Sequence, residues 1–373
     1  MINIVPVTNK QLLKKFIDFP HELYRNEPNY VPELFIAQRD LLTRGKHPFH
    51  EHSSMQLFLA VDNNVVKGRI AAILNNNHNI FNNTCEGFFG FFECVDDLDI
   101  SHSLMDKATE WLKEKGLKSV IGPVNPTTND PCGLLIDGYN LPPVVMTPFN
   151  FSYYSNLLES MGFSKKVDLL SYYLKTNSVN QRSLNLLDAL LKRLQQKQIT
   201  IRQINMKNFA EETSKIKEVY NSAWDKNMGF VPMTDKEFTY LAKDLKQILD
   251  PKYCLVAEQN GKIIGFALAI PDINQILIKI KKGRLLPTGI FKLLFGLKKI
   301  NQVRVLALGV IDGYKKMGIE ACFYAMIIKR AMEKGLEGGE ASWILENNYL
   351  MNKGIQGMNG VIYKKYRLYQ KDI

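Results

Sequence analysis

The stretch VRVLALGVIDGYKKMGIEACFYAMIIKRAMEKG (303–335) decides the fold of this 373-residue chain. It begins with an apolar segment that predicts a buried strand, continues through the polar turn GYKKMG, and ends in a long apolar helix that stops at Gly335. The next segment, EASWILEN (340–347), predicts another strand. A helix that crosses over between two strands places them parallel to each other in the sheet.

The same order of elements occurs in the first half of the chain. An apolar hairpin, CLVAEQNGKIIGFALAI (254–270), precedes the stretch above, and LFLAVDNNVVKGRIAAIL (57–74) repeats its pattern of strand, polar Asn-containing turn and strand. In the first half there follow the strand GFFGFFECVD (87–96), a helix that stops at Gly116, and a third strand. Hairpins alone are common, so the shared order of the later elements is what indicates an internal repeat.

Length and composition agree with two domains. A chain of 373 residues exceeds the size at which a single core usually stops growing, and 46% hydrophobic with 23% charged residues is ordinary for a globular protein. We predict an α/β fold with mixed sheets in two tandem domains, 1–176 and 177–373. The join is placed near 176–200, where LNLLDALLKRLQQKQ (184–198) predicts a connecting helix.

Charge and cysteine content limit the environment and the partners. No apolar stretch reaches the roughly 18 residues of a membrane span, and the N-terminus lacks a signal-peptide pattern, so we expect a soluble cytoplasmic protein. Five scattered cysteines without a CxxC pair indicate reduced thiols. The net charge of +11 indicates attraction to anions, which include nucleic acid, an anionic membrane surface and a phosphorylated cofactor.

The order hairpin, strand, loop, helix, strand, helix, strand resembles that of the GNAT acyl-CoA N-acyltransferase superfamily, as two copies over nearly the whole chain. The resemblance implies an enzyme that transfers an acyl group from the co-substrate acyl-CoA to an amine, with the acceptor pocket between the two domains. It also implies that backbone amides of the loop before the helix that begins near Glu320 hold the CoA pyrophosphate. The implied CoA-binding residues are Val310, Tyr314, Lys315, Lys316, Met317, Gly318, Ile319, Asn347 and Asn348.

This chain departs from the superfamily pattern at two positions of the loop. Lys315 stands where Gln or Arg is usual, and Glu320 stands where a second small residue is expected. A carboxylate at the second position would be unfavourable near phosphate unless it points away. The NPTTND and GLLIDG patterns of the first half also resemble a bacterial group of uncharacterised tandem GNAT-like proteins.

Acylation of an amine needs a base and a proton donor for the leaving thiolate. Glu346 and Glu93 lie at the ends of predicted strands, where a carboxylate could reach a reacting amine. The resemblance implies a tyrosine as the proton donor. The segment IYKKYRLY contains Tyr363, Tyr366 and Tyr369, and because side chains alternate along a strand, not all three can face the same site. We assign the role to Tyr366. The commoner roles of such residues are ion pairing and packing.

The first half has no equivalent phosphate loop. Its corresponding segment, DLDISHSLMDK (97–107), is acidic, so we expect this copy not to bind CoA. The long stretch that follows, 122–154, is rich in Pro, Gly and Asn, and forms either a wall of the substrate site or a structural loop packed between the domains. Its candidate substrate-binding residues are Asn125, Asn129, Asp137 and Tyr139.

Residues 275–300, QILIKIKKGRLLPTGIFKLLFGLKKI, interrupt the second repeat with bulky apolar and basic side chains. Such a segment can lie on an anionic membrane, cover a lipid-like acceptor, enclose a long acyl chain, or form a flap buried against the neighbouring domain. His47, His50 and His52 form another cluster, but no acidic or cysteine partner follows at metal-ligand spacing, so we expect no metal.

Two other functions stay open beside acyl transfer from CoA to a small-molecule amine or lipid-like acceptor. One is a Fem-type transferase that uses aminoacyl-tRNA, which the basic charge suits, although we do not expect nucleic acid as the partner. The other is a non-catalytic membrane-associated or ligand-binding protein that keeps the fold. Binding of CoA would separate the first function from both.

Overall fold

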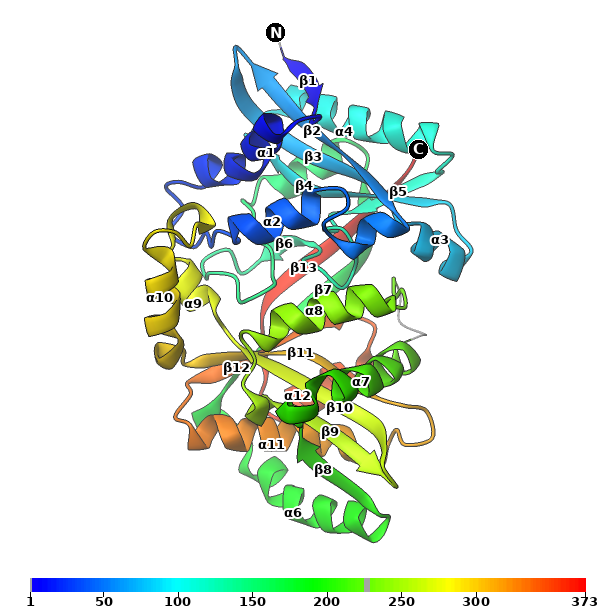
Figure 1. Ribbon diagram of the computed structural model, residues 1–373, viewed down its shortest axis with the longest axis vertical. Helices are drawn as coiled ribbons and strands as arrows, with labels where there is room; N and C mark the ends of the chain where they lie inside the picture. The colour runs from blue at the N-terminus through cyan, green and yellow to red at the C-terminus, as the bar shows by residue number, and fades with distance from the viewer. Residues whose placement is uncertain (1, 225–228) are drawn as a thin grey trace. The chain divides into compact units, whose positions relative to one another are not determined.

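The computed structural model describes residues 2–224 and 229–373, with the side chains of 181–183 excepted. The chain forms two compact units (Figure 1). Unit 1 consists of Met1–Leu169, Asn274–Lys298 and Lys364–Ile373, and unit 2 of Leu170–Ile273 and Lys299–Tyr363. The division at residue 176 stays a prediction. It divides the chain into two continuous halves, whereas each of the two units consists of separate stretches of the chain.

The sheet of unit 1 begins with an antiparallel meander. Strands β1, β2, β3 and β4 pair in sequence, and β4 then pairs in parallel with β5, as the crossover helix predicts. The end of β13 pairs antiparallel with β5 and with β6. The strands are β1 (Asn3–Pro6), β2 (Ser54–Asp62), β3 (Val65–Leu74), β4 (Glu86–Cys94), β5 (Ser119–Gly122), β6 (Leu134–Asp137) and β13 (Val361–Asp372).

The crossover helix of unit 1, α4 (Leu98–Glu114), packs on β2, β3 and β4. Its residues Ile100, Leu104, Ala108 and Leu112 recur every four positions and are all buried, so one face of the helix joins the core. The other helices of this unit are α1 (Lys10–Leu23), α2 (Phe35–Leu42), α3 (Asn76–Asn82), α5 (Tyr154–Ser160), α9 (Asn274–Leu277) and α10 (Gly289–Gly296).

Unit 2 repeats this plan. Its strands follow the order β7, β12, β11, β10, β9, β8, with β11 and β12 parallel and β8 to β11 antiparallel. They are β7 (Ser164–Lys175), which begins in unit 1, β8 (Ile199–Gln203), β9 (Cys254–Gln259), β10 (Lys262–Pro271), β11 (Gln302–Val310) and β12 (Gly338–Leu345). The helices are α6 (Gln181–Gln196), α7 (Phe209–Ala223), α8 (Asp235–Lys246), α11 (Ile319–Glu333) and α12 (Tyr349–Gly357).

Alternating side chains of β9 fill two cores on opposite faces of the unit 2 sheet. Leu255 and Ala257 belong to the core that contains α11 and α6, whereas Cys254 and Val256 belong to the core under α7. This period of two is why a continuous apolar run such as CLVA predicts a strand that is covered on both faces.

The mixed α/β fold and the repeated order of elements are confirmed, as are both hairpins and the helix over 184–198. The first crossover helix was predicted from SLMDKATEWLKEKG (103–116). It begins five residues earlier, at Leu98, where Asp97 caps it. Residues 274–298 form α9, a turn and α10, and belong to unit 1 although they lie between two strands of unit 2 in the sequence.

Candidate functional site

The parallel strands β11 and β12 separate halfway along their length. Their register runs from Gln302 opposite Gly338 to Val305 opposite Ala341, and the ladder stops there although β11 continues to Val310. Diverging strands expose backbone N–H and C=O groups to which an extended ligand can bind by adding to the sheet edge. The residues of β12 from Ser342 onward are therefore not paired with β11.

The helix that follows β11 begins at an uncapped N-terminus. Gly318 is the N-cap of α11 with φ of +94°, and as a glycine it has no side chain that could cap the first-turn amides. The first intrahelical bond is donated by Cys322 N to Gly318 O at 3.0 Å. Helix geometry leaves the amides of the preceding residues directed out of the helix end, where the helix dipole is positive. This end is therefore suited to bind a phosphate.

The side chains of the loop before α11 have different roles. The Tyr314 hydroxyl donates to Gln259 Oε1 at 2.6 Å and so fixes the loop to β9. Lys315 Nζ lies 2.7 Å from Asp312 Oδ1, so part of its charge is neutralised within the loop. Lys316 is exposed. The remaining predicted residues of the loop are in or against the core, with Val310 and Ile319 buried and Met317 packed on them.

Glu320 lies in the first turn of α11 and is half-buried. Its carboxylate opposes binding of an anion at this helix end.

The equivalent positions of unit 1 are closed. Asp97 caps α4, and its Oδ1 accepts from Ile100 N at 3.0 Å. Beyond β5 the chain stays against β4, because Val124 N donates to Phe89 O at 2.9 Å and Asn125 Oδ1 accepts from Phe91 N at 2.7 Å. A carboxylate therefore occupies the helix end and backbone occupies the gap between strands, and the absence of CoA binding in this copy stays a prediction.

The chain after β12 is held by amide side chains. Asn348 is the N-cap of α12, and its Oδ1 accepts from Met351 N at 3.2 Å. Asn352 Nδ2 donates to the carbonyls of Leu345 at 3.0 Å and Glu346 at 3.3 Å. The side chain of Asn347 is exposed and that of Glu346 is half-buried. Asn348 thus has a structural partner, and the assignment of these three residues to CoA binding and catalysis stays a prediction.

A buried charged network lies where the β11 and β12 ladder stops. Arg304 and Glu340 face each other across the ladder, and each is 1% exposed. Ser342 and Tyr363 donate to the two Glu340 oxygens, Arg304 Nε donates to Ser342 Oγ at 3.0 Å, and the guanidinium lies 4.8 Å from the Trp343 ring centroid. The sequence analysis missed this network. Its signal was a charged residue inside each apolar strand, in VRVLALGV and GGEASW.

Unit 1 contains a second buried carboxylate network around Glu93. Tyr24 and Tyr154 donate to Glu93 Oε2 at 2.5 and 2.9 Å, and Arg69 Nη2 lies 3.9 Å from Oε1 on the neighbouring strand. Burial raises the pKa of Glu93, and Arg69 only partly opposes this. Burial, and then the Glu93 carboxylate, raise the pKa of Tyr24 well above its usual value. Glu93 was predicted from its place at a strand end, whereas its partners gave no sequence signal.

His21 adds an imidazole to the Tyr24 side of this network. Its Nδ1 is 3.0 Å from the Tyr30 hydroxyl, and the Tyr30 ring stacks on Tyr24 with 4.7 Å between centroids. Burial, followed by the nearby positive charge of Arg69, lowers the pKa of His21 to about 4. The imidazole is therefore neutral at pH 7.

The three tyrosines of β13 lie in different surroundings. Tyr363 is in unit 2 and donates to Glu340. Tyr366 is fully buried in unit 1, where it packs against Gly133. The Tyr369 hydroxyl donates to Glu159 Oε1 at 3.2 Å. Tyr366 as the proton donor stays a prediction, and Tyr363 is the one of the three that belongs to the unit with the uncapped helix.

The candidate substrate residues of 122–154 all lie in unit 1. The Tyr139 hydroxyl donates to Leu135 O at 2.9 Å, and Asn125 binds the β4 backbone as described above. Asn129 N donates to Thr127 Oγ1 at 3.1 Å, and Asp137 is exposed at the end of β6. Two of the four side chains therefore hold the loop in place, and the assignment of all four to substrate binding stays a prediction.

The histidine cluster is held by local hydrogen bonds. His50 Nε2 is 2.8 Å from Leu41 O, and His52 Nδ1 is 2.6 Å from Ser53 Oγ. Within the described ranges, no group of three His, Cys, Asp or Glu side chains has the geometry of a metal site. Among the helices of those ranges, none is both long and apolar enough to cross a bilayer.

Comparisons with known proteins place the chain. No family model matches it. Protein YghO of Escherichia coli is 34% identical over 373 residues, which cover 98% of this chain and 94% of that protein. The bacterial ceramide synthase of Caulobacter vibrioides is 32% identical over 378 residues, covering 99% of this chain and 97% of that protein.

Among solved structures, a tandem GNAT protein from the clavulanic acid biosynthesis pathway covers 100% of this chain and 98% of its own, with a TM-score of 0.57 at 9% identity. That likeness concerns the fold alone, so the chain has a tandem GNAT-like fold. By sequence, the chain belongs to the family that includes YghO and the bacterial ceramide synthase.

Proposed function

We propose that this protein transfers a fatty acyl group from acyl-CoA to the primary amine of a lipid-like acceptor and forms an amide. The observation that carries the proposal is the pair of features at one end of unit 2, an uncapped helix N-terminus beside diverging parallel strands. The first suits the pyrophosphate of CoA and the second suits its amide-containing pantetheine arm. CoA is a natural ligand for both because it carries the two groups in one chain.

We call the loop and first turn of α11, residues 315–321, the CoA cradle. Its residues have definite tasks in this proposal. The amides of Ile319, Glu320 and Ala321 would bind pyrophosphate oxygens, and Lys316 would add positive charge from its exposed position. Gly318 gives the backbone the left-handed turn that presents these amides. Lys315 would contribute less, because Asp312 already neutralises it.

The reaction needs few groups from the protein. The neutral amine nitrogen attacks the thioester carbonyl, the carbon–sulfur bond breaks, and the proton lost by nitrogen is taken up by the thiolate or by solvent. A base is needed because an amine is protonated at pH 7, and a hydrogen-bond donor must hold the oxyanion. Glu346 and Glu93 as the base, and Tyr366 as the thiolate acid, belong to the proposal as candidates to be tested individually.

The similarity to the bacterial ceramide synthase supports a lipid-like acceptor. A ceramide is the N-acyl derivative of a long-chain amino alcohol, and the protein named for its synthesis is 32% identical to this one over nearly the full length. We therefore propose a long-chain amine as the acceptor and a long-chain acyl-CoA as the donor.

The proposal is tested by a two-substrate assay on the purified protein. Palmitoyl-CoA is incubated with sphinganine, hexadecylamine or ethanolamine, released CoA thiol is measured by colour reaction, and the amide product is identified by mass spectrometry. We expect product with both long-chain amines and little with ethanolamine. Absence of any amide together with no calorimetric binding of acyl-CoA would contradict the proposal and turn attention to aminoacyl-tRNA.

A charge variant links the activity to the cradle. Lys316→Glu should weaken binding of palmitoyl-CoA about tenfold, since it reverses one charge near the phosphates. The matched control is Lys329→Glu, which makes the same change at an exposed position further along α11. Equal loss in both variants would mean that overall charge, rather than the cradle, attracts the cofactor.

A further inference from the structure

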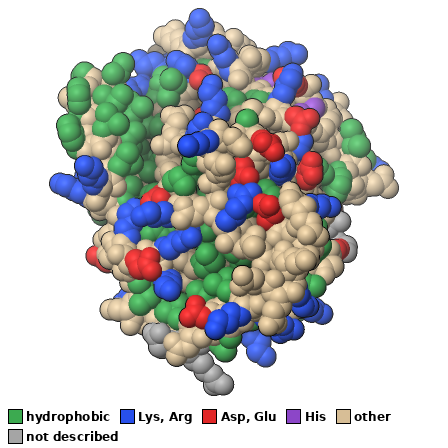
Figure 2. Space-filling model, turned by 60° about the horizontal axis from the view of Figure 1, so that its bottom comes forward, with side chains coloured by type: hydrophobic (Ala, Val, Ile, Leu, Met, Phe, Trp, Pro, Cys, Tyr) green, Lys and Arg blue, Asp and Glu red, His purple; other side chains and the backbone are tan. Residues whose placement is uncertain are grey.

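The segment around α10 exposes an unusual concentration of large hydrophobic side chains. The apolar docking patch, as we call it, comprises six of them within twelve residues, each between 37% and 78% exposed. They are Leu286, Ile290, Phe291, Leu294, Phe295 and Leu297. Figure 2 shows hydrophobic side chains gathered on the side of the molecule where α10 lies in Figure 1, with Lys and Arg side chains around them. An apolar group of this kind on a water-facing helix indicates an interaction surface.

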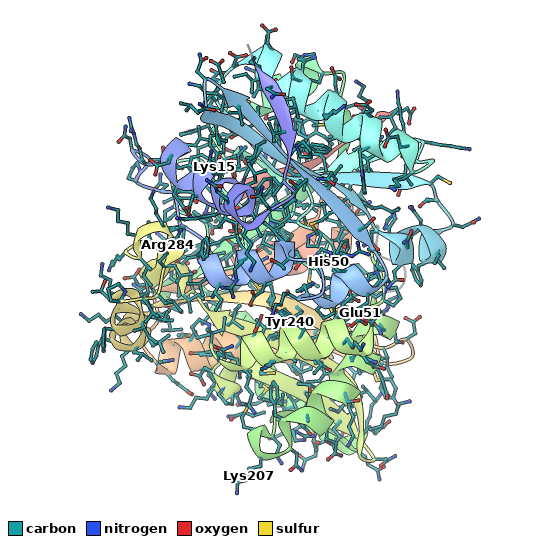
Figure 3. All side chains as sticks on the ribbon, turned by 45° about the horizontal axis from the view of Figure 1, so that its top comes forward. Lys15, His50, Glu51, Lys207, Tyr240 and Arg284 are labelled. Atoms are coloured by element: carbon teal, nitrogen blue, oxygen red, sulfur yellow. The ribbon has the colours of Figure 1, made fainter. Side chains whose placement is uncertain are left out.

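Contacts with α1 fix the base of the segment, and its inner face is buried. The patch therefore lies on the remaining, exposed face. Arg284, which is labelled in Figure 3, forms two hydrogen bonds to Asp18 of α1, at 2.8 and 3.0 Å. Its guanidinium lies 3.9 Å from the Phe35 ring centroid. Lys282 pairs with Glu22 of the same helix. At the other end, Gly296 allows α10 to approach Ile276 of α9 so closely that a β-carbon would meet it at 2.8 Å.

The inner face of the segment is buried while the patch is not. Ile276, Leu277 and Ile280 belong to the buried side, whereas the bulky residues of α10 point outward. Within the segment, Ile276 and Leu277 of α9 are therefore buried and the bulky side chains of α10 are exposed. This division is that of an amphipathic element whose second apolar face has a partner outside the chain.

The positive charge of the segment indicates the chemistry of that partner. Residues 274–299 contain seven Lys and Arg and no Asp or Glu. Lys282 and Arg284 are paired with α1, which leaves five lysines, all exposed: Lys279, Lys281, Lys292, Lys298 and Lys299. A symmetric contact between two copies of the patch would bring ten like charges together, and a chain of net charge +11 gives no compensation. An anionic lipid surface supplies both apolar depth and negative charge.

We propose that the apolar docking patch binds the surface of an anionic lipid bilayer, with Phe291, Leu294 and Phe295 inserted at the level of the acyl-chain boundary and the lysines at the headgroups. The binding is reversible and peripheral, because one amphipathic helix of eight residues buries only one face. It does not depend on the proposed catalytic activity. It would place the protein where a long-chain amine resides.

The experiment is co-sedimentation of the full-length protein with vesicles, without substrates. Vesicles of phosphatidylcholine with 30% phosphatidylglycerol are compared with phosphatidylcholine alone, at 0.1 and 0.5 M salt. We expect binding to the anionic vesicles that falls in high salt, because the lysine contribution is screened. Phe291→Ser with Phe295→Ser should lower the partition coefficient at least about tenfold, since two bulky side chains are removed from the inserted face.

Two further variants make the result specific. Ile80→Ser with Phe81→Ser removes two exposed hydrophobic residues from α3, 79% and 45% exposed, and should leave binding unchanged. Lys281→Glu with Lys298→Glu should weaken binding to anionic vesicles without changing the thermal midpoint of unfolding.

Equal loss in the α3 control, or no binding to anionic vesicles by the unmodified protein, would overturn the proposal. So would a dimer in light scattering that becomes a monomer only in the Phe291/Phe295 variant. Because the assay contains no acyl-CoA, a failure here is distinct from a failure of the proposed activity.

Discussion

Replacement of Gly318 by alanine tests the CoA cradle most directly. Gly318 has φ of +94°, a conformation that costs a residue with a β-carbon about 1–2 kcal/mol. The added β-carbon would also lie 3.0 Å from Leu190 Cδ2 of α6, close enough to require a small shift of that side chain. If the loop relaxes to relieve this strain, the first-turn amides of α11 move, and binding of phosphate must restore them at the same cost.

The expected effects of Gly318→Ala are on stability and on affinity. A cost of about 1–2 kcal/mol corresponds to a fall of several degrees in the thermal midpoint for a unit of this size. The same energy corresponds to about five- to thirtyfold weaker binding of acyl-CoA, measured by calorimetry at 25 °C. Adding Leu190→Ala to the Gly318→Ala variant should recover only the part of the lost affinity for acyl-CoA that arises from the side-chain contact, because the backbone strain remains.

Gly335→Ala is the matched control for this prediction. Gly335 lies at the other end of α11, also has positive φ, at +72°, and has no atom within 4 Å of the position of a β-carbon. It should cost similar stability and leave the affinity for acyl-CoA unchanged. If both variants lose affinity equally, or if Gly318→Ala loses stability alone, the helix end is not where the phosphates bind.

Three further predictions concern individual side chains. Arg304→Met leaves the Glu340 carboxylate buried without its counter-charge, and should cost about 3–5 kcal/mol in urea unfolding. Because the pKa of His21 falls from 6.5 unfolded to about 4 folded, only the unfolded state binds the proton between these values, so stability falls by about 3 kcal/mol as the pH drops through that window. Glu93 has a raised pKa and changes stability with pH in the opposite direction. The free energy of unfolding in urea is therefore measured at pH 7 and pH 4.5 for the unmodified protein and for His21→Gln, and the two pH dependences are subtracted. Asp97→Ala removes the cap of α4 and should cost about 0.5–2 kcal/mol without changing the affinity for acyl-CoA.

The sequence was sufficient for the features that depend on local periodicity. The hairpins at 57–74 and 254–270 and the helix at 319–333 each follow from a pattern of apolar residues bounded by turn residues, so no distant contact is needed to predict them. The loop before α11 was found in the same way, because its position between a strand and a helix is local.

The sequence was insufficient wherever distant segments meet. Residues 274–298 join unit 1 through ion pairs of Lys282 and Arg284 with α1, and nothing near them in the sequence names those partners. Tyr24 reaches Glu93 from 69 residues away for the same reason. The buried charges Arg304 and Glu340 left a weak trace, a charged residue in each of two apolar strands, but only the register of those strands shows that they face each other.

The two copies differ at more than one position of the helix end and strand gap that we propose for CoA in unit 2. Asp97 occupies the end of α4, and its removal alone would free only the helix amides. The gap between strands would stay closed, because a β-carbon at Gly90 would lie 2.0 Å from Val124 O, so glycine at this position is what lets the closing backbone approach β4. The same approach delivers the Asn125 side chain to Phe91 N. A carboxylate cap, a glycine and an asparagine thus act together in unit 1, while unit 2 has an uncapped helix and a ladder that stops early. Because several residues close these positions in unit 1, no single substitution there would open both the helix end and the strand gap, and the end of α11 is where acyl-CoA binding should be tested first.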